Sequence, residues 1–182
     1  MTSQEIIEKI KSACGDKVLK AEVTLGDAVV HVAPAAFFEV AKFLRDDLEL
    51  AFNYLSHITG VDYLEMPGEP RFEAVYELHA IDHNHSIRVR VGLPEENPSV
   101  PTVIDLWPSA TYPERELFDM YGINVKGHPN LTRLLMPEGW EGHPLRKDYP
   151  LTTEQVAFTH NIDFKREQVK AKVPERYKPG SL

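Results

Sequence analysis

Two stretches of strict alternation constrain the fold more than any other feature of this sequence. In residues 72–78, Phe, Ala, Tyr and Leu occupy every second position, and residues 87–93 repeat the pattern with Ile, Val, Val and Leu. A period of two is typical of β-strands with one buried face, because successive side chains point to opposite sides. We therefore predict a β-hairpin with one solvated face, on which Glu73 or Glu77 lies across from Arg88 or Arg90.

Two helices are predicted before this hairpin. Thr2 and Glu5 fit a capping box that begins a helix, and Gly15 would end it. Pro34 is placed to open a second helix that runs to about Leu48, because apolar residues recur there at helical spacing. Packing of this apolar stripe against a sheet is favoured over its use as a groove for a partner.

Three further strands complete the predicted core. Residues 18–24 and 28–32 flank Gly26-Asp27, which is a two-residue hairpin signal, and a strand-like stretch lies near 55–63. The order of elements is helix, hairpin, helix and three strands. It predicts an α+β two-layer domain in which two helices cover one face of a mixed five-stranded sheet.

The character of the chain changes after a third predicted helix, which ends at Tyr121-Gly122. Residues 1–122 are therefore predicted to form the core domain with its closing helix. From residue 123 onward prolines recur and neither period persists, yet apolar and aromatic residues remain frequent. Sixty residues without regular structure are too many for a loop inside a compact domain, and their apolar content is too high for a disordered segment. We predict that residues 123–182 form an extended, proline-punctuated arm that docks on a partner protein.

Bulk composition excludes several functions. The net charge of −8 opposes nucleic-acid binding, and the single cysteine, Cys14, cannot hold an iron–sulfur cluster or a Cys-built zinc site. We expect Cys14 to be a small buried residue. No apolar run reaches the ~18 residues of a membrane span, and the N-terminus lacks the apolar core of a signal peptide. Glycine-rich nucleotide loops and nucleophile elbows are also absent from the sequence.

One run of residues has the composition of a metal site. His79, Asp82, His83 and His85 lie within seven positions, and histidine with carboxylate could ligate zinc or iron. The same run falls where the hairpin must turn, and short polar residues are typical of turns. A solvated turn is the favoured interpretation, and a metal site is the alternative.

Two Gly-His-Pro units, at residues 127–129 and 142–144, could supply a pair of catalytic histidines. Glycine and proline are the strongest turn-forming residues, and a residue before proline is biased to extended backbone. Turns are therefore the favoured interpretation of both units.

A charged cluster lies on the third predicted helix. Glu114, Glu116 and Asp119 could perform acid–base chemistry if burial raised one pKa. Thr111 with Glu114, however, fits a capping box, and Arg115 with Asp119 fits an i,i+4 ion pair. Ion pairing is favoured over catalysis for these carboxylates.

Residues 114–151 closely resemble the signature of the 30 kDa subunit of respiratory complex I, which is the C subunit of the bacterial enzyme. The matching elements are Glu114–Glu116, Asp119–Ile123, Gly127–Pro129, Leu131–Leu135 and Pro144–Leu151. Val125 departs from the pattern, where an aromatic residue is more usual. The predicted order of elements also resembles the fold of that family.

The resemblance implies a structural, cofactor-free subunit in the peripheral arm of a proton-translocating NADH:quinone oxidoreductase. FMN, iron–sulfur clusters, NADH and quinone would then be bound by other subunits. The implied partners are the quinone-site subunit (49 kDa or D type) and the neighbouring iron–sulfur subunits. The implied location is the cytoplasmic face of the bacterial inner membrane, reached only through the complex. The alternative is an equivalent subunit of a membrane-bound nickel–iron hydrogenase or another complex-I-like redox complex.

The resemblance also selects residues expected at a subunit interface or in the family signature, and none of them is expected to be catalytic. Arginine suits interface ion pairs because its planar group binds carboxylates through two hydrogen bonds. The basic candidates are Arg115, Arg133, Arg146 and Lys147, and the acidic ones are Glu114, Glu116, Asp119 and Asp148. The apolar anchors are Leu134, Leu135, Trp140 and Tyr149, and the remaining signature residues are Tyr121, Gly122, Gly127, His128 and Pro129.

Overall fold

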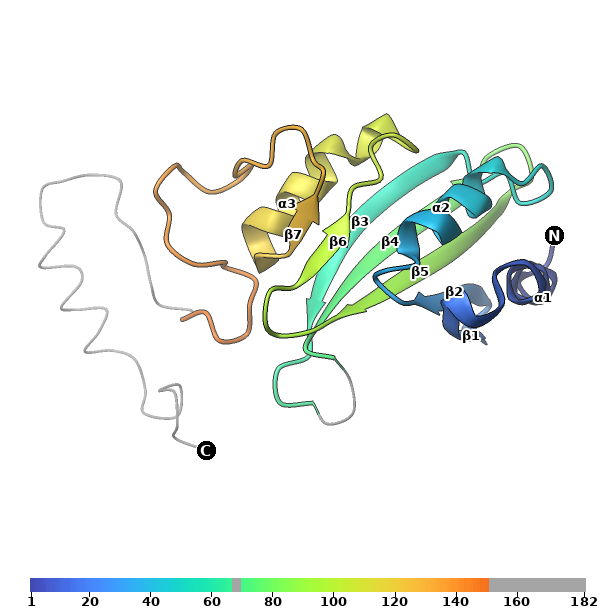
Figure 1. The fold of residues 1–182 in the computed structure, drawn as a ribbon, viewed down its shortest axis with the longest axis horizontal. Helices are drawn as coiled ribbons and strands as arrows, with labels where there is room; N and C mark the ends of the chain where they lie inside the picture. Colours follow the sequence, from blue (N-terminus) through green and yellow to red (C-terminus); the bar gives the residue numbers. More distant parts are fainter. Residues whose placement is uncertain (67–69, 151–182) are drawn as a thin grey trace, which may run out of the picture.

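The computed structural model of the chain describes residues 1–66 and 70–150 and confirms an α+β domain (Figure 1). Short 3-10 turns, Gly15–Lys17 and Pro108–Ala110, follow α1 and precede α3. The helices and strands are α1 (Ser3–Cys14), β1 (Val18–Thr24), β2 (Asp27–Val32), α2 (Phe37–Asp46), β3 (Tyr54–Asp62), β4 (Phe72–Ala80), β5 (His85–Leu93), β6 (Ser99–Pro101), α3 (Thr111–Tyr121) and β7 (Asn124–Lys126).

The central sheet has five strands in the order β1-β2-β5-β4-β3, with β2 and β5 parallel and the other pairs antiparallel. The predicted mixed sheet is therefore confirmed. The β1–β2 hairpin turns at Leu25 and Gly26, whose φ angles are 54° and 96°, so Asp27 begins β2 rather than lying in the turn. A second, two-stranded sheet joins β6 to β7 in parallel.

α1 and α2 contribute their apolar faces to the main core. The predicted capping box is confirmed, because the Thr2 hydroxyl accepts a hydrogen bond from the Glu5 N–H and the Glu5 carboxylate accepts one from the Thr2 N–H. Cys14 is half-buried at the end of α1 and packs against the core. The buried residues of the two helices are Ile6, Ile7 and Ile10 of α1 and Phe37, Val40, Ala41 and Leu44 of α2.

The second helix is shorter than predicted. It begins at Phe37 because Pro34 lies in a turn closed by a hydrogen bond from the Ala36 N–H to the Ala33 carbonyl, 3.0 Å long. It ends at Asp46 because Asp47 is extended and its carboxylate accepts the N–H groups of the following turn. The prediction that Leu48 belongs to the apolar stripe is wrong, since 89% of its surface is exposed.

The hairpin face predicted to be solvated is largely covered by its own side chains. Glu77 lies opposite Arg88 and forms an ion pair with it, as predicted. Glu73, in contrast, is only 2% exposed. Its carboxylate accepts hydrogen bonds from the Tyr63 hydroxyl at 3.1 Å and from Arg90 Nη1 at 3.2 Å. Long side chains of adjacent strands therefore bury a charge on the face away from α1 and α2.

α3 packs against β3, at the edge of the sheet opposite β1 (Figure 1). The approach is close because Gly60 of β3 has no side chain: a Cβ atom there would lie 2.6 Å from Cδ2 of Tyr121. This edge of the sheet therefore depends on one glycine to receive the helix that carries the signature residues.

We expect Gly60→Ala to lower the free energy of unfolding by about 1–3 kcal/mol, because the added methyl group overlaps the Tyr121 ring. At an ordinary strand position, alanine in place of glycine stabilises by about 0.5–1 kcal/mol, so the sign of the change is diagnostic. Urea unfolding measures the change. In a Tyr121→Ala background the penalty should disappear, and an unchanged penalty there would contradict the proposed contact.

Candidate functional site

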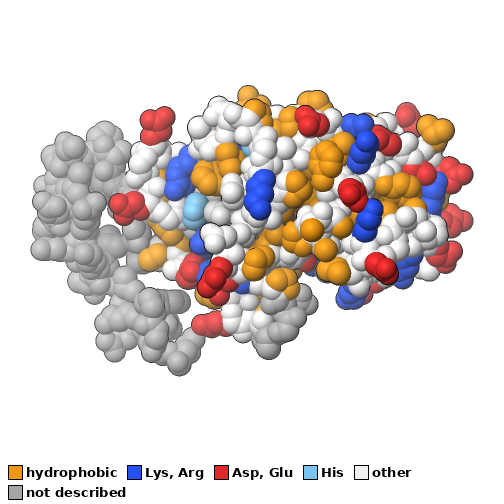
Figure 2. All heavy atoms as spheres, viewed as in Figure 1, with side chains coloured by type: hydrophobic (Ala, Val, Ile, Leu, Met, Phe, Trp, Pro, Cys, Tyr) orange, Lys and Arg blue, Asp and Glu red, His pale blue; other side chains and the backbone are white. Residues whose placement is uncertain are grey.

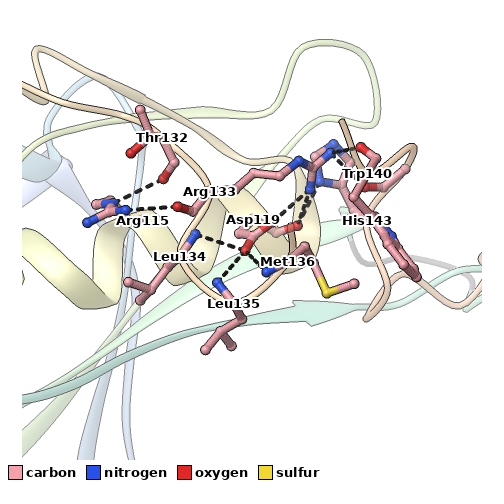
Figure 3. Close-up of polar contacts among 10 residues, drawn as sticks. Arg115, Asp119, Thr132, Arg133, Leu134, Leu135, Met136, Trp140 and His143 are labelled. Atoms are coloured by element: carbon pink, nitrogen blue, oxygen red, sulfur yellow. Dashed lines mark hydrogen bonds and ion pairs between the residues drawn. The ribbon is translucent and has the colours of Figure 1, made fainter. Parts of the chain in front are cut away.

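Asp119 is the best-satisfied buried charge of the signature, with none of its surface exposed. One carboxylate oxygen, Oδ2, accepts hydrogen bonds from three successive N–H groups, those of Leu134 at 3.0 Å, Leu135 at 2.8 Å and Met136 at 2.9 Å (Figure 3). Oδ1 pairs with Arg133 Nη1 at 2.7 Å. We call these five residues the Asp119 cluster.

Two opposing effects set the pKa of Asp119. Burial alone would raise it, but the hydrogen bonds from the Met136 N–H and from Arg133 outweigh burial and hold the pKa below its usual value. The carboxylate is therefore ionised at neutral pH. Both of its oxygens are occupied by donors of its own chain, so Asp119 is not arranged to transfer a proton.

Arg133 extends the cluster further along the chain. Its Nη2 atom donates to the carbonyls of Trp140 at 2.8 Å and Gly142 at 3.0 Å, while Nη1 is bound to Asp119 (Figure 3). One guanidinium group thereby ties residues 140–142 to α3. A planar group with several donors suits this task, because a lysine could not reach the same acceptors in fixed directions.

The predicted ion pair between Arg115 and Asp119 is wrong. Arg115 donates instead to the carbonyls of Thr132 at 3.0 Å and Arg133 at 2.8 Å (Figure 3). Its guanidinium also lies 5.8 Å from the centre of the Tyr112 ring. The reason is that the Asp119 oxygens are already occupied by the segment that follows β7, and Arg115 holds the carbonyl side of that same segment.

The C-terminal end of α3 receives residues 143–146. Arg146 Nε donates to the Tyr121 carbonyl at 2.6 Å, and His143 Nδ1 lies 3.0 Å from the Asp119 carbonyl. Gly122 is in the left-handed conformation (φ 70°), which confirms the predicted helix end. A Cβ atom on Gly122 would overlap Nη2 of Arg146. A cation at the C-terminus of a helix also complements the helix dipole.

Asp62 and Arg71 form a second contact region, which the sequence interpretation missed. Asp62 is 4% exposed and accepts the Lys147 N–H at 2.8 Å, and Arg71 pairs with Asp148 at 2.6 Å as well as with Asp62 at 3.3 Å. A usable signal was strand register, because Asp62 lies two residues after Gly60 on the same face of β3. Lys147 and Asp148 are thereby fixed to the end of the sheet.

Glu114 is fully buried and does not take part in a capping box, so that prediction is wrong. Thr111 is already helical, and its hydroxyl donates to the Pro108 carbonyl at 2.8 Å. The Glu114 carboxylate accepts from the Thr102 hydroxyl at 2.6 Å and from the Val103 N–H at 2.7 Å. Burial raises the pKa of Glu114 above its usual value, although these two donors oppose the shift.

The first Gly-His-Pro unit forms a turn, as predicted. His128 Nε2 donates to the Thr111 carbonyl at 3.1 Å, and its Nδ1 accepts the Asn130 N–H at 3.0 Å, so both ring nitrogens are used. Gly127 has a φ of 86°, and Pro129 is exposed. The turn therefore fastens the start of the segment to the N-terminus of α3.

The predicted apolar anchors differ in exposure. Leu134, Trp140 and Tyr149 are half-buried, whereas Leu135 is 61% exposed. The Tyr149 ring lies against Gly142, where a Cβ atom would be 2.8 Å from Cε2 of the ring. The Glu116 side chain is half-buried and makes no hydrogen bond or ion pair within the described residues.

The histidine-rich run divides between a turn and a strand. Asp82 and His83 are exposed in the turn, as predicted, but His85 belongs to β5, is only 9% exposed and bonds the Leu50 carbonyl through Nε2 at 2.7 Å. Burial lowers the pKa of His85. Across residues 1–66 and 70–150, no three His, Cys, Asp or Glu side chains are grouped closely enough to hold a metal ion. In the same residues no helix has both the length and the apolarity that crossing a membrane requires.

We expect Asp119→Asn to destabilise the chain by about 3 kcal/mol, because it leaves the Arg133 charge without its partner and one donor of the cluster without an acceptor. Urea unfolding measures this loss. Trypsin should then cut after Arg133 faster than in the wild type, because the ion pair that holds this side chain is lost. Since the pKa of Asp119 is lowered, its contribution is present above the usual value of 3.8 and vanishes as the pH falls below it.

Glu116→Gln is the matched control, since Glu116 lies on the same helix and has no polar contact within the described residues. We expect its free energy of unfolding to stay within about 0.5 kcal/mol of the wild type. Equal losses in the two variants would show that any charge removal on α3 has this effect, and would refute the role of the Asp119 cluster.

Glu114→Gln should change stability with pH in a different way from Asp119→Asn, because the pKa values of the two carboxylates shift in opposite directions. A raised pKa means that Glu114 stabilises the native state below its usual value of 4.5, and that this contribution is lost as the pH rises through the folded value. The stability of the variant relative to the wild type should therefore increase as the pH rises above 4.5. Urea unfolding at several pH values measures the difference. A difference that does not change with pH would contradict the assignment.

Comparisons with known proteins identify the family of the chain. Residues 30–155 match the family described as "Respiratory-chain NADH dehydrogenase, 30 Kd subunit". The C subunit of the NADH-quinone oxidoreductase of Roseiflexus castenholzii is 52% identical over 158 residues, which cover 87% of this chain and 90% of that protein. The C subunit of the Herpetosiphon aurantiacus enzyme is 45% identical over 139 residues, covering 76% of this chain and 80% of that protein.

Two solved structures share the fold. A trypsin-resistant fragment (1–134) of Nqo5 matches with a TM-score of 0.62 and 34% identity, covering 72% of this chain and all of the fragment. A chain of a membrane-bound sulfane sulfur reductase, an archaeal respiratory membrane complex, matches with a TM-score of 0.68 and 22% identity, covering 81% of this chain and 85% of that chain. The extent of the family match and the identity to these bacterial C subunits confirm the resemblance carried by residues 114–151, and the chain belongs to the family of the 30 kDa subunit of respiratory-chain NADH dehydrogenase.

Proposed function

We propose that this chain is a cofactor-free supporting subunit in the peripheral arm of a proton-translocating NADH:quinone oxidoreductase. In this proposal it packs against the quinone-site subunit (49 kDa or D type) and the neighbouring iron–sulfur subunits. FMN, iron–sulfur clusters, NADH and quinone are bound by those other subunits. The chain lies at the cytoplasmic face of the bacterial inner membrane and reaches the membrane only through the complex.

The use of the signature charges within the chain is the observation that carries this proposal. Asp119, Arg133, Arg115 and Arg146 bind backbone groups of residues 119–142 or one another. A catalytic carboxylate needs a free oxygen directed at a substrate, and both oxygens of Asp119 are bonded within the chain. Their arrangement supports a role in fixing the shape of residues 131–149.

The effect of a supporting subunit on the reaction is positional. Electron transfer and quinone chemistry depend on the placement of neighbouring subunits, and small displacements of supporting groups can lose much of the rate. We propose a division of labour within the signature: Arg115, Arg133 and Arg146 order the segment, while Leu135 and Lys147, whose side chains are exposed, face partner subunits. Glu116 belongs with this second group, because its carboxylate makes no polar contact within the described residues.

The alternative is an equivalent subunit in another complex-I-like redox complex, such as a membrane-bound nickel–iron hydrogenase. The fold match to a chain of the archaeal sulfane sulfur reductase shows that the same fold occurs in a different respiratory complex. Sequence favours the NADH-linked assignment, since identity is 52% to the C subunit of an NADH-quinone oxidoreductase and 22% to the archaeal chain.

Purification of an affinity-tagged chain from membranes of its host tests the proposal. We expect it to co-purify with subunits that carry flavin and iron–sulfur clusters, in an assembly that oxidises NADH and reduces quinone. Membranes of a strain that lacks the gene should lose this activity, and a plasmid-borne copy should restore it.

The purified chain alone supplies the control. It should bind neither flavin nor iron and should show no NADH oxidation, because the proposal assigns those groups to other subunits. Stoichiometric flavin or iron in the isolated chain would contradict the supporting role. An assembly with hydrogenase activity and no NADH oxidation would select the alternative.

A further inference from the structure

Residues 134–142, which we call the 134–142 loop, have an unusual relation between backbone and side chains. The N–H groups of Leu134, Leu135 and Met136 all point inward to the Asp119 carboxylate, whereas the Leu135 side chain points away from it (Figure 3). Arg133 holds the other end of the loop through the carbonyls of Trp140 and Gly142. The loop is therefore fixed at both ends to one ion pair, of which the Asp119 side is fully buried.

Leu135 is 61% exposed at the outer side of this fixed loop. An exposed leucine on a mobile loop is common and needs no explanation. Here, however, a fully buried carboxylate and an arginine are used to order the backbone that displays it. Ordering in the free chain removes an entropic cost that binding would otherwise bear, which is the physical advantage of a preformed contact element.

The charges beside Leu135 limit what can cover it. Glu138 and Glu141 are exposed on the same loop, and neither forms an ion pair within the described residues. An anionic membrane surface would repel this loop. A second copy would bring the same acids together, and the chain already carries a net charge of −8, with acidic side chains spread over the face shown in Figure 2.

We propose that the 134–142 loop is a preformed docking element whose Leu135 side chain enters an apolar pocket, bordered by lysine or arginine, on a neighbouring protein subunit. The inference rests on the proposed function, because it assumes membership of a multisubunit complex. It goes further in assigning the contact to one side chain, and in giving the Asp119 cluster the task of presenting that side chain.

Replacement of the chromosomal gene by tagged Leu135→Asp tests the proposal in the host. We expect at least a tenfold loss of chain in the assembled complex, measured by native electrophoresis and immunoblotting of mildly solubilised membranes. The isolated variant should keep the unfolding midpoint and the amide-exchange rates of residues 134–136 that the wild type shows, because the exposed side chain does not support the fold.

Leu48→Asp is the matched control. Leu48 is 89% exposed and lies just before β3. The Lys147 N–H binds Asp62 at the opposite end of β3, so Leu48 is distant from this contact. The control variant should assemble like the wild type. If Leu135→Asp also assembles like the wild type, the docking inference is overturned while the supporting function stands. If even the wild-type chain co-purifies with no redox subunit, the proposed function itself fails.

The acidic border gives a second, independent measurement. Glu138→Lys combined with Glu141→Lys should reduce assembly several-fold, and the defect should grow when membranes are solubilised at low ionic strength. Normal assembly of this variant would refute the prediction that lysine or arginine borders the pocket.

Two further measurements test the other occupants. Binding of the isolated wild-type chain to anionic phosphatidylglycerol vesicles would assign the loop to a lipid surface, and a Leu135-dependent dimer in sedimentation experiments would assign it to a second copy. Either result would overturn the proposal.

Discussion

The ionised carboxylate of Asp119 is the interaction on which residues 131–142 depend. A buried charge is expensive to remove from water, and it persists in a folded chain only where donors replace the lost water. Here one guanidinium and three backbone N–H groups surround it, and the resulting pKa lies below the usual value. These donors offset the cost of burying the charge. In turn, they fix a segment of the backbone that has few regular hydrogen bonds of its own.

α3 connects this segment to the rest of the domain through different atoms along its length. Near its N-terminus, Glu114 accepts hydrogen bonds from the Thr102 hydroxyl and the Val103 N–H, which follow β6. At its C-terminus, the Tyr121 carbonyl accepts Arg146, and the Tyr121 ring packs against Gly60 of β3. One helix thus joins the main sheet, the small β6–β7 sheet and the proline-rich segment. Displacement of α3 would move all three together.

Local patterns in the sequence predict the sheet, the capping box of α1 and the end of α3, because each depends on neighbouring residues. Period-two alternation locates β4 and β5, and Gly122 marks the end of α3. The partners of the charged residues were not predictable in this way. Arg115 and Asp119 are four residues apart on a helix, but they bind backbone groups that lie 18 and 16 residues away. Such pairings depend on where an irregular segment returns, and no periodicity encodes that path. Strand register could have placed Asp62 beside Gly60, but it could not have shown that its partner is Lys147, which lies 85 residues away.

The two buried carboxylates of α3 differ in their electrostatics although they lie on the same helix. Burial acts on both, yet the pKa of Glu114 is raised and that of Asp119 is lowered. The difference lies in the donors: Glu114 receives one hydroxyl and one N–H, whereas Asp119 receives three N–H groups and a cation. A pair of groups with separated pKa values is typical of acid–base sites when both face a common cleft. These two carboxylates bind different segments of their own chain: Glu114 binds residues 102–103, and Asp119 binds residues 133–136. Within the described residues, both carboxylates thus order irregular parts of the backbone.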